Sequence, residues 1–287
     1  MRKHKYFLIL ITLTISAVFC SISINFPVQA TFFDDWPMFR HDPAHTGHSE
    51  SSAPTENITV LWTAEKGLVG SPVVANGFVY MHSSSELRCL NASDGQEIWN
   101  VTSAYVGGQD YSPAVYEGYI YTPGAAYNAF TGTLFLNYTY CKAYGSPTVT
   151  NDIIYMGSPI TNCFFALNAI TGQTIWNFTT GGEIESSAAV SNGYIYFVSF
   201  DDNIYALDAF NGTKIWNFKV NSSLAISSPA VFDGCVYVGS HDNVYCLNAI
   251  NGTKLWNNSK TGCTSYCSPA VANGVVYIGS MDNNLYA

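Results

Sequence analysis

The stretch ALDAFNGTKIW, at residues 206–216, recurs in variant form along the chain. Each copy places apolar residues on both sides of an Asx-Ala-x-x-Gly turn, which is a strong signal for a β-hairpin. Four of the five copies end in tryptophan, and the fifth ends in Leu136. The other copies are CLNASDGQEIW at 89–99, AYNAFTGTLFL at 126–136, ALNAITGQTIW at 166–176 and CLNAINGTKLW at 246–256.

A second signature precedes each hairpin and occurs a sixth time near the end of the sequence. It is a serine followed by proline or alanine, a short apolar run, a polar turn and a strand that ends in tyrosine. The serines and the tyrosines both advance by 41, 34, 41, 41 and 40 residues. A four-stranded unit that repeats at this length predicts a β-propeller blade. The serines are Ser71, Ser112, Ser146, Ser187, Ser228 and Ser268, and the tyrosines are Tyr80, Tyr121, Tyr155, Tyr196, Tyr237 and Tyr277.

The composition agrees with an all-β fold class. Aromatic residues make up 15% of the 287 residues and charged residues 11%. This balance suits many short, half-buried strands joined by polar, uncharged turns. We therefore predict an all-β propeller of four-stranded blades, in which six blades are visible.

The pattern Ala-x-(Asp/Asn)-Ala-x-x-Gly-x-x-x-Trp resembles the tryptophan-docking repeat of pyrroloquinoline-quinone-type β-propellers, over residues 58–287. The segment DWPMFRHDPAHTGHS at 35–49 is similar to the lead-in that precedes such propellers in exported proteins. The family contains quinone-dependent dehydrogenases, the non-enzymatic propeller subunit of the bacterial outer-membrane assembly machinery, and surface proteins of unknown role. The resemblance implies that docking tryptophans stack against the neighbouring blade. These are Trp99, Trp176, Trp216 and Trp256, with Trp62 as their N-terminal equivalent.

The first docking strand and the last blade suggest how the ring closes. The strand at 58–65 carries Trp62 but has no blade before it, and the repeat that ends at Ala287 has no docking strand after it. We expect residues 58–65 to pair with 283–287 and complete a sixth blade with Trp62 buried. The alternative is an open arc that continues beyond residue 287, because the family more often has seven or eight blades.

Residues 1–30 have the pattern of a signal peptide. Arg2, Lys3 and Lys5 precede an uncharged apolar run, and a small-residue cleavage site follows at 28–30. The low-charge stretch at 6–26 is also long enough for an uncleaved membrane anchor. Either alternative places the rest of the chain outside the cytoplasm, extracellularly or at the cell surface.

The rest of the chain divides into a lead-in segment at 31–57 and propeller repeats at 58–287. Without residues 1–30 it carries 8 cationic and 20 anionic side chains, a net charge of −12. An acidic surface repels phosphate backbones, so nucleic acid is not expected as a partner. A membrane would be contacted only through an uncleaved N-terminal segment.

The lead-in segment contains a possible metal site. His41, His45 and His48 lie within eight residues, and imidazoles at such spacing can bind Zn²⁺ or Cu²⁺. The alternative is a polar segment that packs on the propeller through Trp36 and Phe39. We predict the packed segment and no metal, and the three histidines are the candidate ligands if a metal is bound instead.

The cysteines do not match a quinone site. The resemblance implies that the dehydrogenases hold their quinone between a tryptophan and a disulfide of two adjacent cysteines, beside Ca²⁺. No two cysteines are adjacent in this sequence, so no cofactor is predicted. Cys263 and Cys267 are close enough for a local disulfide, whereas Cys89 and Cys246 replace alanine in the repeat and are expected to be buried.

Nine Asn-x-Ser/Thr sequons occur in the sequence. Turn chemistry alone explains the asparagines in the hairpin turns. Four others directly follow the docking position on the outermost strand, where alternation turns them away from the docking face. These are the glycosylation candidates Asn100, Asn137, Asn177 and Asn257.

These features predict an exported propeller that acts as a binding or scaffolding module at the cell surface. Its ring would offer two loop faces and a central funnel to a protein or a surface polysaccharide. The alternative is an enzyme, either a divergent quinoprotein or a hydrolase with its site on the ring axis. No catalytic residue can be named from the sequence.

Overall fold

The computed structural model describes most of the chain after residue 34, and the regular secondary structure there consists of β-strands. No helix in this part of the chain is long and apolar enough to cross a membrane. The predicted signal peptide or anchor lies outside the described residues. The described ranges are 35–49, 60–64, 70–83, 85–103, 111–138, 143–220, 227–241, 243–259, 264 and 267–287.

The strands form six antiparallel sheets, which we call blades 1 to 6, and this confirms the predicted all-β propeller fold. Five blades have four strands in sequential order, and blade 6 has three. Blade 1 contains β1 (Val73–Ala75), β2 (Phe78–His82), β3 (Glu86–Asn91) and β4 (Glu97–Thr102). Blade 2 contains β5 (Ala114–Tyr116), β6 (Tyr119–Tyr121), β7 (Ala125–Asn128) and β8 (Leu134–Asn137). Blade 3 contains β9 (Thr148–Thr150), β10 (Ile153–Gly157), β11 (Cys163–Asn168) and β12 (Thr174–Thr179).

The later blades repeat this arrangement. Blade 4 contains β13 (Ala189–Ser191), β14 (Tyr194–Ser199), β15 (Asn203–Asp208) and β16 (Lys214–Lys219). Blade 5 contains β17 (Ala230–Phe232), β18 (Cys235–Gly239), β19 (Val244–Asn248) and β20 (Lys254–Asn258). Blade 6 contains β21 (Ala270–Ala272), β22 (Val275–Gly279) and β23 (Leu285–Tyr286).

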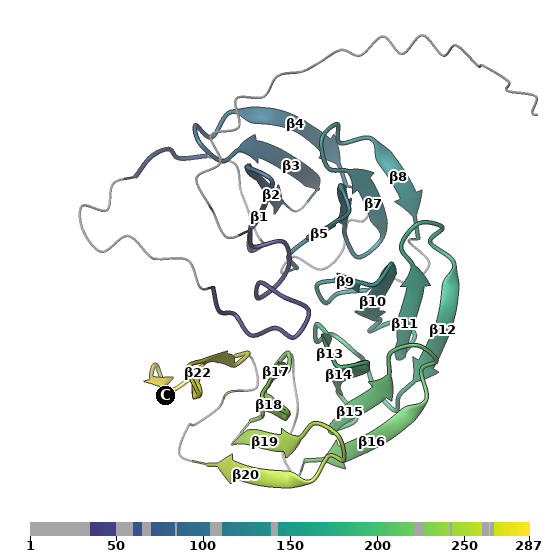
Figure 1. Ribbon diagram of the computed structural model, residues 1–287, viewed down its shortest axis with the longest axis vertical. Coiled ribbons are helices and arrows are strands. Elements are labelled where there is room, and N and C mark those ends of the chain that lie inside the picture. The colour runs from purple at the N-terminus through teal and green to yellow at the C-terminus, as the bar shows by residue number, and fades with distance from the viewer. Residues whose placement is uncertain are drawn as a thin grey trace, which may run out of the picture. The chain divides into compact units, whose positions relative to one another are not determined.

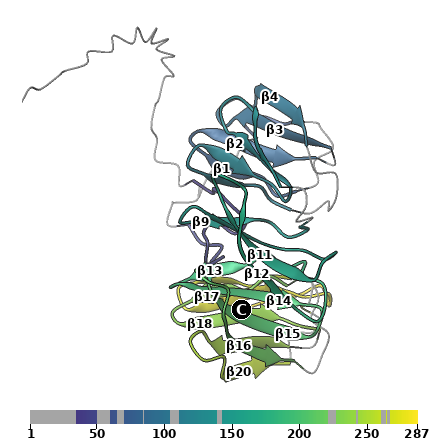
Figure 2. The same cartoon turned by 90° about the vertical axis from the view of Figure 1, so that its right-hand side faces the viewer.

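The blades follow one another in chain order, as Figure 1 shows. The first strand of each blade lies on the inner side, and the fourth strand, where a blade has one, lies on the outer side. The outer strands β4 and β20 lie at opposite ends of the view in Figure 2. Inner strands of successive blades touch in the pairs β1–β5, β5–β9, β13–β17 and β17–β21.

Two kinds of turn join the strands of a blade at the same end. In blade 4 the first turn is Asn192-Gly193, with φ of 51° and 80°, the left-handed geometry that a two-residue hairpin needs. The turn between the third and fourth strands is held by Asp208, whose Oδ1 accepts the backbone N–H groups of Phe210 and Asn211. Local side-chain chemistry therefore sets both turns, as in an Asx turn.

A tryptophan on the fourth strand of one blade docks on a turn of the next. Trp176 of blade 3 donates its indole N–H to the carbonyl oxygen of Ala209 in blade 4, at 3.1 Å. Tyr155 of blade 3 donates its hydroxyl to the same oxygen, also at 3.1 Å. Trp216 and Tyr196 of blade 4 meet Ala249 O of blade 5 in the same way, at 2.9 and 3.1 Å, and Trp99 reaches Ala129 O at 3.0 Å.

Two positions in this series depart from the pattern. Blade 2 has Leu136 in place of tryptophan, so among the described residues Ala169 O accepts from the Tyr121 hydroxyl alone, at 3.3 Å. Trp256 of blade 5 is 42% exposed, whereas Trp216 is 8% exposed.

The expected closing pair of strands is absent from the described residues. Residues 60–64 form no strand, and β23 pairs only with β22. Trp62 is half-buried rather than buried, and its indole N–H bonds to Ala92 O of blade 1 at 3.0 Å. The predicted pairing is therefore wrong for residues 60–64, where Trp62 docks on blade 1 and β23 is a strand of only two residues. Residues 58, 59 and 65 of the predicted strand lie outside the described residues.

Candidate functional site

The described part of the predicted lead-in, residues 35–49, is called the lead-in segment from here on, and it runs along the inner strands of the blades (Figure 1). Trp36 forms a two-way backbone pair with Val74 of β1, with N···O distances of 2.7 and 2.9 Å. Further lead-in carbonyls then accept inner-strand N–H groups at 2.6 to 2.9 Å. The donor is the same valine of the repeat each time. These pairs are Pro37 with Val115, Pro43 with Val190, Ala44 with Val231 and Thr46 with Val271.

This pairing explains why the inner strands tolerate their position. An inner strand has one free edge toward the axis, and its N–H groups need partners there. The lead-in segment supplies those partners from carbonyl groups. The lead-in backbone thus lies along the inner strands, on the side where the sequence predicts a central funnel.

His45 replaces the backbone contact at blade 3. Its ring is fully buried, with Nε2 at 3.2 Å from Thr148 Oγ1 and Nδ1 at 3.3 Å from Pro229 O. Burial, aided by the nearby Arg40 charge, lowers the pKa of His45 to about 3. The imidazole is therefore neutral near pH 7, and it joins blades 3 and 5 across the lead-in segment.

The three candidate histidines are not brought together. Both ring nitrogens of His45 are engaged by the propeller, and His41 Nδ1 lies 3.5 Å from Asp42 Oδ2. In the part of the chain that the structure describes, no group of three or more His, Cys, Asp or Glu side chains could hold a metal ion. The rings of Trp36 and Phe39 contact His41 and His45 within the segment itself. The segment contacts the propeller through the backbone bonds given above and through His45.

The serines of the repeat form a hydrogen-bonded series around the inner strands. The backbone N–H of Ser112 donates to Ser146 Oγ at 2.9 Å, and Ser146 N–H donates to Ser187 Oγ at 2.9 Å. Ser187 N–H then donates to Ser228 Oγ at 3.0 Å, and Ser228 N–H to Ser268 Oγ at 2.9 Å. Sequence reasoning used these serines only as repeat markers, although their constant spacing was the signal for a contact between blades.

The end of the blades that carries both hairpin turns, which we call the turn face, exposes a series of apolar side chains. They follow the docking alanine in the turns of blades 2 to 5. Phe130 is 50% exposed, Ile170 61%, Phe210 68% and Ile250 66%. Single exposed apolar residues are ordinary on a protein surface, and these four share one position of the repeat on the same face. The sequence showed this position in every copy, yet only the structure shows that it is exposed.

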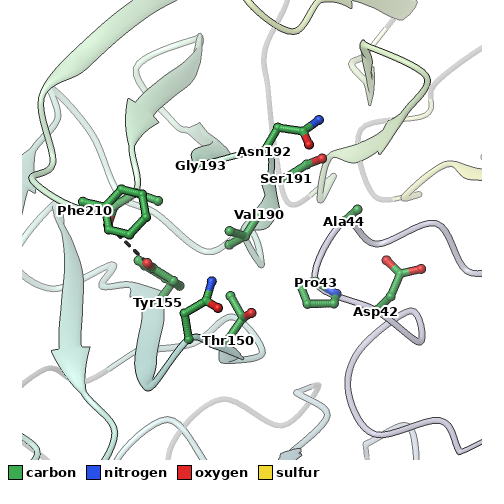
Figure 3. Close-up of a pocket in the computed structure, with 12 residues that line it drawn as sticks. Asp42, Pro43, Ala44, Thr150, Tyr155, Val190, Ser191, Asn192, Gly193 and Phe210 are labelled. Carbon is green, nitrogen blue, oxygen red and sulfur yellow. Dashed lines mark hydrogen bonds between the residues drawn. The ribbon is translucent and has the colours of Figure 1, made fainter.

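A cavity of about 350 Å³ opens between the turns of blades 3 and 4. Figure 3 shows Phe210, Tyr155 and Asn192 on the blade side and Asp42 of the lead-in segment across from them. Phe210 thus belongs both to the exposed series and to this cavity. The cavity makes the turn face concave beside an aromatic ring.

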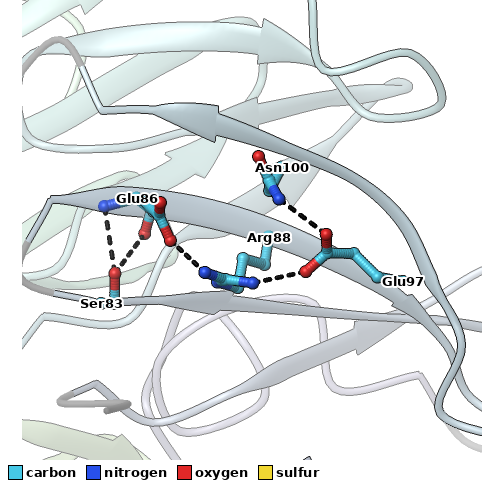
Figure 4. A network of polar contacts seen from close by, with 5 residues as sticks. All are labelled: Ser83, Glu86, Arg88, Glu97 and Asn100. Carbon is cyan, nitrogen blue, oxygen red and sulfur yellow. Dashed lines mark hydrogen bonds and ion pairs between the residues drawn. The ribbon is translucent and has the colours of Figure 1, made fainter. Parts of the chain in front are cut away.

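The glycosylation candidates lie exposed on the outermost strands β4, β8, β12 and β20. Asn100 also belongs to a polar network on blade 1, drawn in Figure 4, in which its amide donates to Glu97. Arg88 lies between Glu86 and Glu97 in that network and is 8% exposed. Exposure leaves Asn100, Asn137, Asn177 and Asn257 accessible, and their glycosylation stays a prediction.

Comparison with known proteins adds the family. The family described as outer membrane protein assembly factor BamB matches residues 59–178 and 165–287, most of the chain. The chain belongs to the BamB family. No curated protein matches this BamB-family chain.

Solved structures show the same fold at low identity. BamB from Moraxella catarrhalis aligns with 19% identity and a TM-score of 0.62, over 79% of this chain and 75% of that one. A europium-containing methanol dehydrogenase aligns with 13% identity and a TM-score of 0.66, over 79% of this chain and 58% of that one. A quinohemoprotein alcohol dehydrogenase from Pseudomonas putida HK5 has 15% identity and a TM-score of 0.62, and the matched part is 79% of this chain and 48% of that protein.

The residues of this BamB-family chain do not fit a quinone site. The five cysteines in the described residues all lie apart from one another in sequence, so none forms a pair of adjacent cysteines. Cys89 is buried beside Tyr80, and burial raises the pKa of its thiol to about 12. Cys141 and Cys263 lie outside the described residues, so the expected Cys263–Cys267 disulfide does too. The lead-in backbone moreover lies along the inner strands, where an axial group would bind.

Proposed function

We propose that this BamB-family chain is an exported, non-enzymatic scaffold that binds a protein partner on its turn face. The observation that carries the proposal is the exposed apolar series Phe130, Ile170, Phe210 and Ile250, one side chain from each of four successive blades. Exposed apolar side chains favour a protein as the partner over a polysaccharide, because an isoleucine side chain cannot form hydrogen bonds with a sugar.

The negative charge of the turn face indicates which charge the partner carries. Glu117, Asp152 and Asp233 are exposed in the turns between first and second strands, beside the apolar series. Complementary charge steers association and selects partners. The proposed partner segment therefore carries lysine or arginine next to apolar residues.

The N-terminal sequence supports export to the cell surface. The basic residues, the apolar run and the small-residue site at 28–30 match a signal peptide, and the net charge of −12 without residues 1–30 suits a soluble surface domain. The sequons on the outermost strands accord with this location. An unchanged absorption spectrum after addition of quinone and Ca²⁺ would separate this scaffold from a quinoprotein.

Site-specific photo-crosslinking in the native host tests the proposal. A photoreactive residue at position 210 should capture one discrete protein, and Ile170→Asp should abolish the capture, because a charge in an apolar contact is left desolvated. Position 200 is the matched control: Phe200 is 41% exposed but lies in the turn between β14 and β15, at the opposite end of blade 4. The same adducts at 200 and 210, or none at 210, would reject the turn face as the binding surface.

A further inference from the structure

A second cavity lies against the lead-in segment on its blade 1 side. It has a volume of about 320 Å³ and is lined by apolar side chains and by Arg40, Ser71 and Ser112. The apolar walls come from Trp36, Met38 and Phe39. Its lining thus combines an apolar surface with one cation and two serines.

Arg40 is a largely buried cation without an anion. Its Nη1 donates to Ser268 O at 2.8 Å, and its Nε is enclosed and has no acceptor among the described residues. No carboxylate of the described residues forms an ion pair with it; the nearby Asp42 accepts instead from the backbone N–H and the hydroxyl of Thr46. Burial lowers the pKa of Arg40 to about 10, so the guanidinium stays charged at neutral pH.

Such an arrangement is costly unless something completes it. Buried charges in proteins are paired or hydrogen-bonded, and removal of the partner of a buried charge is strongly destabilising. A guanidinium has five N–H donors in a fixed plane, and a carboxylate is the group that matches this geometry best.

The serine series is interrupted at the same place. From Ser112 onward each serine N–H donates to the next serine hydroxyl. The corresponding bond from Ser71 to Ser112 is not formed among the described residues, so the Ser71 N–H and the Ser112 hydroxyl keep their capacity for a ligand. Two polar groups therefore face the cavity together with the guanidinium of Arg40.

We propose that this cavity binds a small carboxylate with an apolar body. The carboxylate accepts from Arg40 and from the polar groups of Ser71 and Ser112, and the apolar body packs against Trp36, Met38 and Phe39. The site lies beside the first blades and is separate from the turn face proposed above, so either can fail without the other.

Calorimetric titration of the full chain with benzoate and with benzamide tests the site. The two probes share a shape and differ in charge. We expect saturable binding of benzoate, at least about tenfold tighter than that of benzamide. Arg40→Gln should weaken benzoate binding at least about tenfold and Arg40→Lys should weaken it less, because lysine keeps the charge but not the planar donors.

Two further variants keep the test decisive. Lys219→Gln removes an exposed cation and should leave benzoate binding unchanged. Ser112→Ala removes a hydroxyl that bonds nothing in the described residues, so the fold should persist while benzoate binding weakens several-fold; this variant decides the matter if Arg40→Gln does not fold. Equal affinity for both probes, or absence of saturation, would overturn the proposal. Unchanged benzoate affinity in Ser112→Ala and in a folded Arg40→Gln would overturn it too, and if Arg40→Gln does not fold, unchanged affinity in Ser112→Ala is enough.

Discussion

At the scale of the residue, the docking tryptophan and a turn glycine of the next blade determine each other. Gly212 has a φ of 72°, and a Cβ there would lie 2.5 Å from Cε3 of Trp176. Gly95 and Gly252 stand in the same relation to Trp62 and Trp216. The glycine of the repeat is thus required twice, for its left-handed backbone and for the indole that covers it.

Substitution of Gly212 separates these two requirements. Gly212→Ala should lower the free energy of unfolding by about 2–5 kcal/mol, because a methyl group adds overpacking against Trp176 to the left-handed strain. Gly234 has a φ of 71° and nothing within 4 Å of its Cβ position, so Gly234→Ala should cost only about 1–2 kcal/mol. Urea unfolding measures both. Equal losses would show that the indole does not press on the turn.

His45 makes the free energy of unfolding depend on pH. Its pKa is lowered from the usual value of 6.5 to about 3. Below pH 6.5 the unfolded chain takes up a proton that the folded chain refuses, so stability falls as the pH falls toward 3. From this group the loss is about 1.4 kcal/mol per pH unit once the pH is below 6.5.

We expect His45→Asn to flatten the stability profile between pH 6.5 and 5, where few carboxylates titrate. Urea unfolding at each pH provides the measurement, and the exposed His241→Asn is the control. His82 contributes in the same direction, because burial lowers its pKa to about 4, so a shallower slope should remain in the His45 variant. A variant whose profile runs parallel to that of the wild-type protein would contradict the neutral state of the buried ring.

At the scale of the element, blade 2 lacks the docking bond with which other blades are joined to the next blade. Leu136 supplies no donor to Ala169 O, and β8 has 4 residues where β12 and β16 have 6. Amide hydrogen exchange should therefore be faster in β8 than in β16, since local opening is easier where fewer contacts hold a strand. Exchange followed by mass spectrometry on peptides from both strands would show it. Equal protection would mean that Tyr121 alone suffices to join blades 2 and 3.

Sequence reasoning reaches the elements that repeat and fails where the chain does not. The strands, the hairpin turns and the docking positions follow from local patterns that occur five or six times. The path of the lead-in segment depends on backbone bonds such as Pro43 O to Val190 N, between residues far apart in sequence and without a side-chain signal. The same limit explains the unpaired Arg40 and the failed strand pairing at 283–287, since both depend on what lies nearby in space.

At the scale of the whole molecule, the lead-in segment contacts all six blades within the part of the chain that the structure describes. Its carbonyl groups pair with five inner-strand valines, His45 contacts blade 3, and Arg40 reaches Ser268 of blade 6. Other contacts described here join neighbouring blades in pairs: the docking tryptophans, the tyrosine hydroxyls that share their acceptors, and the serine series. The lead-in segment thus links contacts between neighbours into one cooperative unit.

Deletion of residues 35–47 should therefore abolish cooperative folding rather than shorten the chain harmlessly. It leaves five inner-strand N–H groups without their present partners. Each buried unsatisfied group costs about 1–3 kcal/mol, so the total of about 5–15 kcal/mol is as large as the free energy of unfolding of an ordinary domain. A synthetic peptide of residues 35–49, added to the deletion variant, should restore a single sharp thermal transition. The same peptide with glycine in place of Pro43 and Ala44 should restore it less, because it keeps the carbonyl groups but has a more flexible backbone. Thermal unfolding monitored by circular dichroism gives the readout. If the deleted protein melts at the wild-type temperature without any peptide, the inner strands satisfy themselves and the lead-in segment is not what unites the blades.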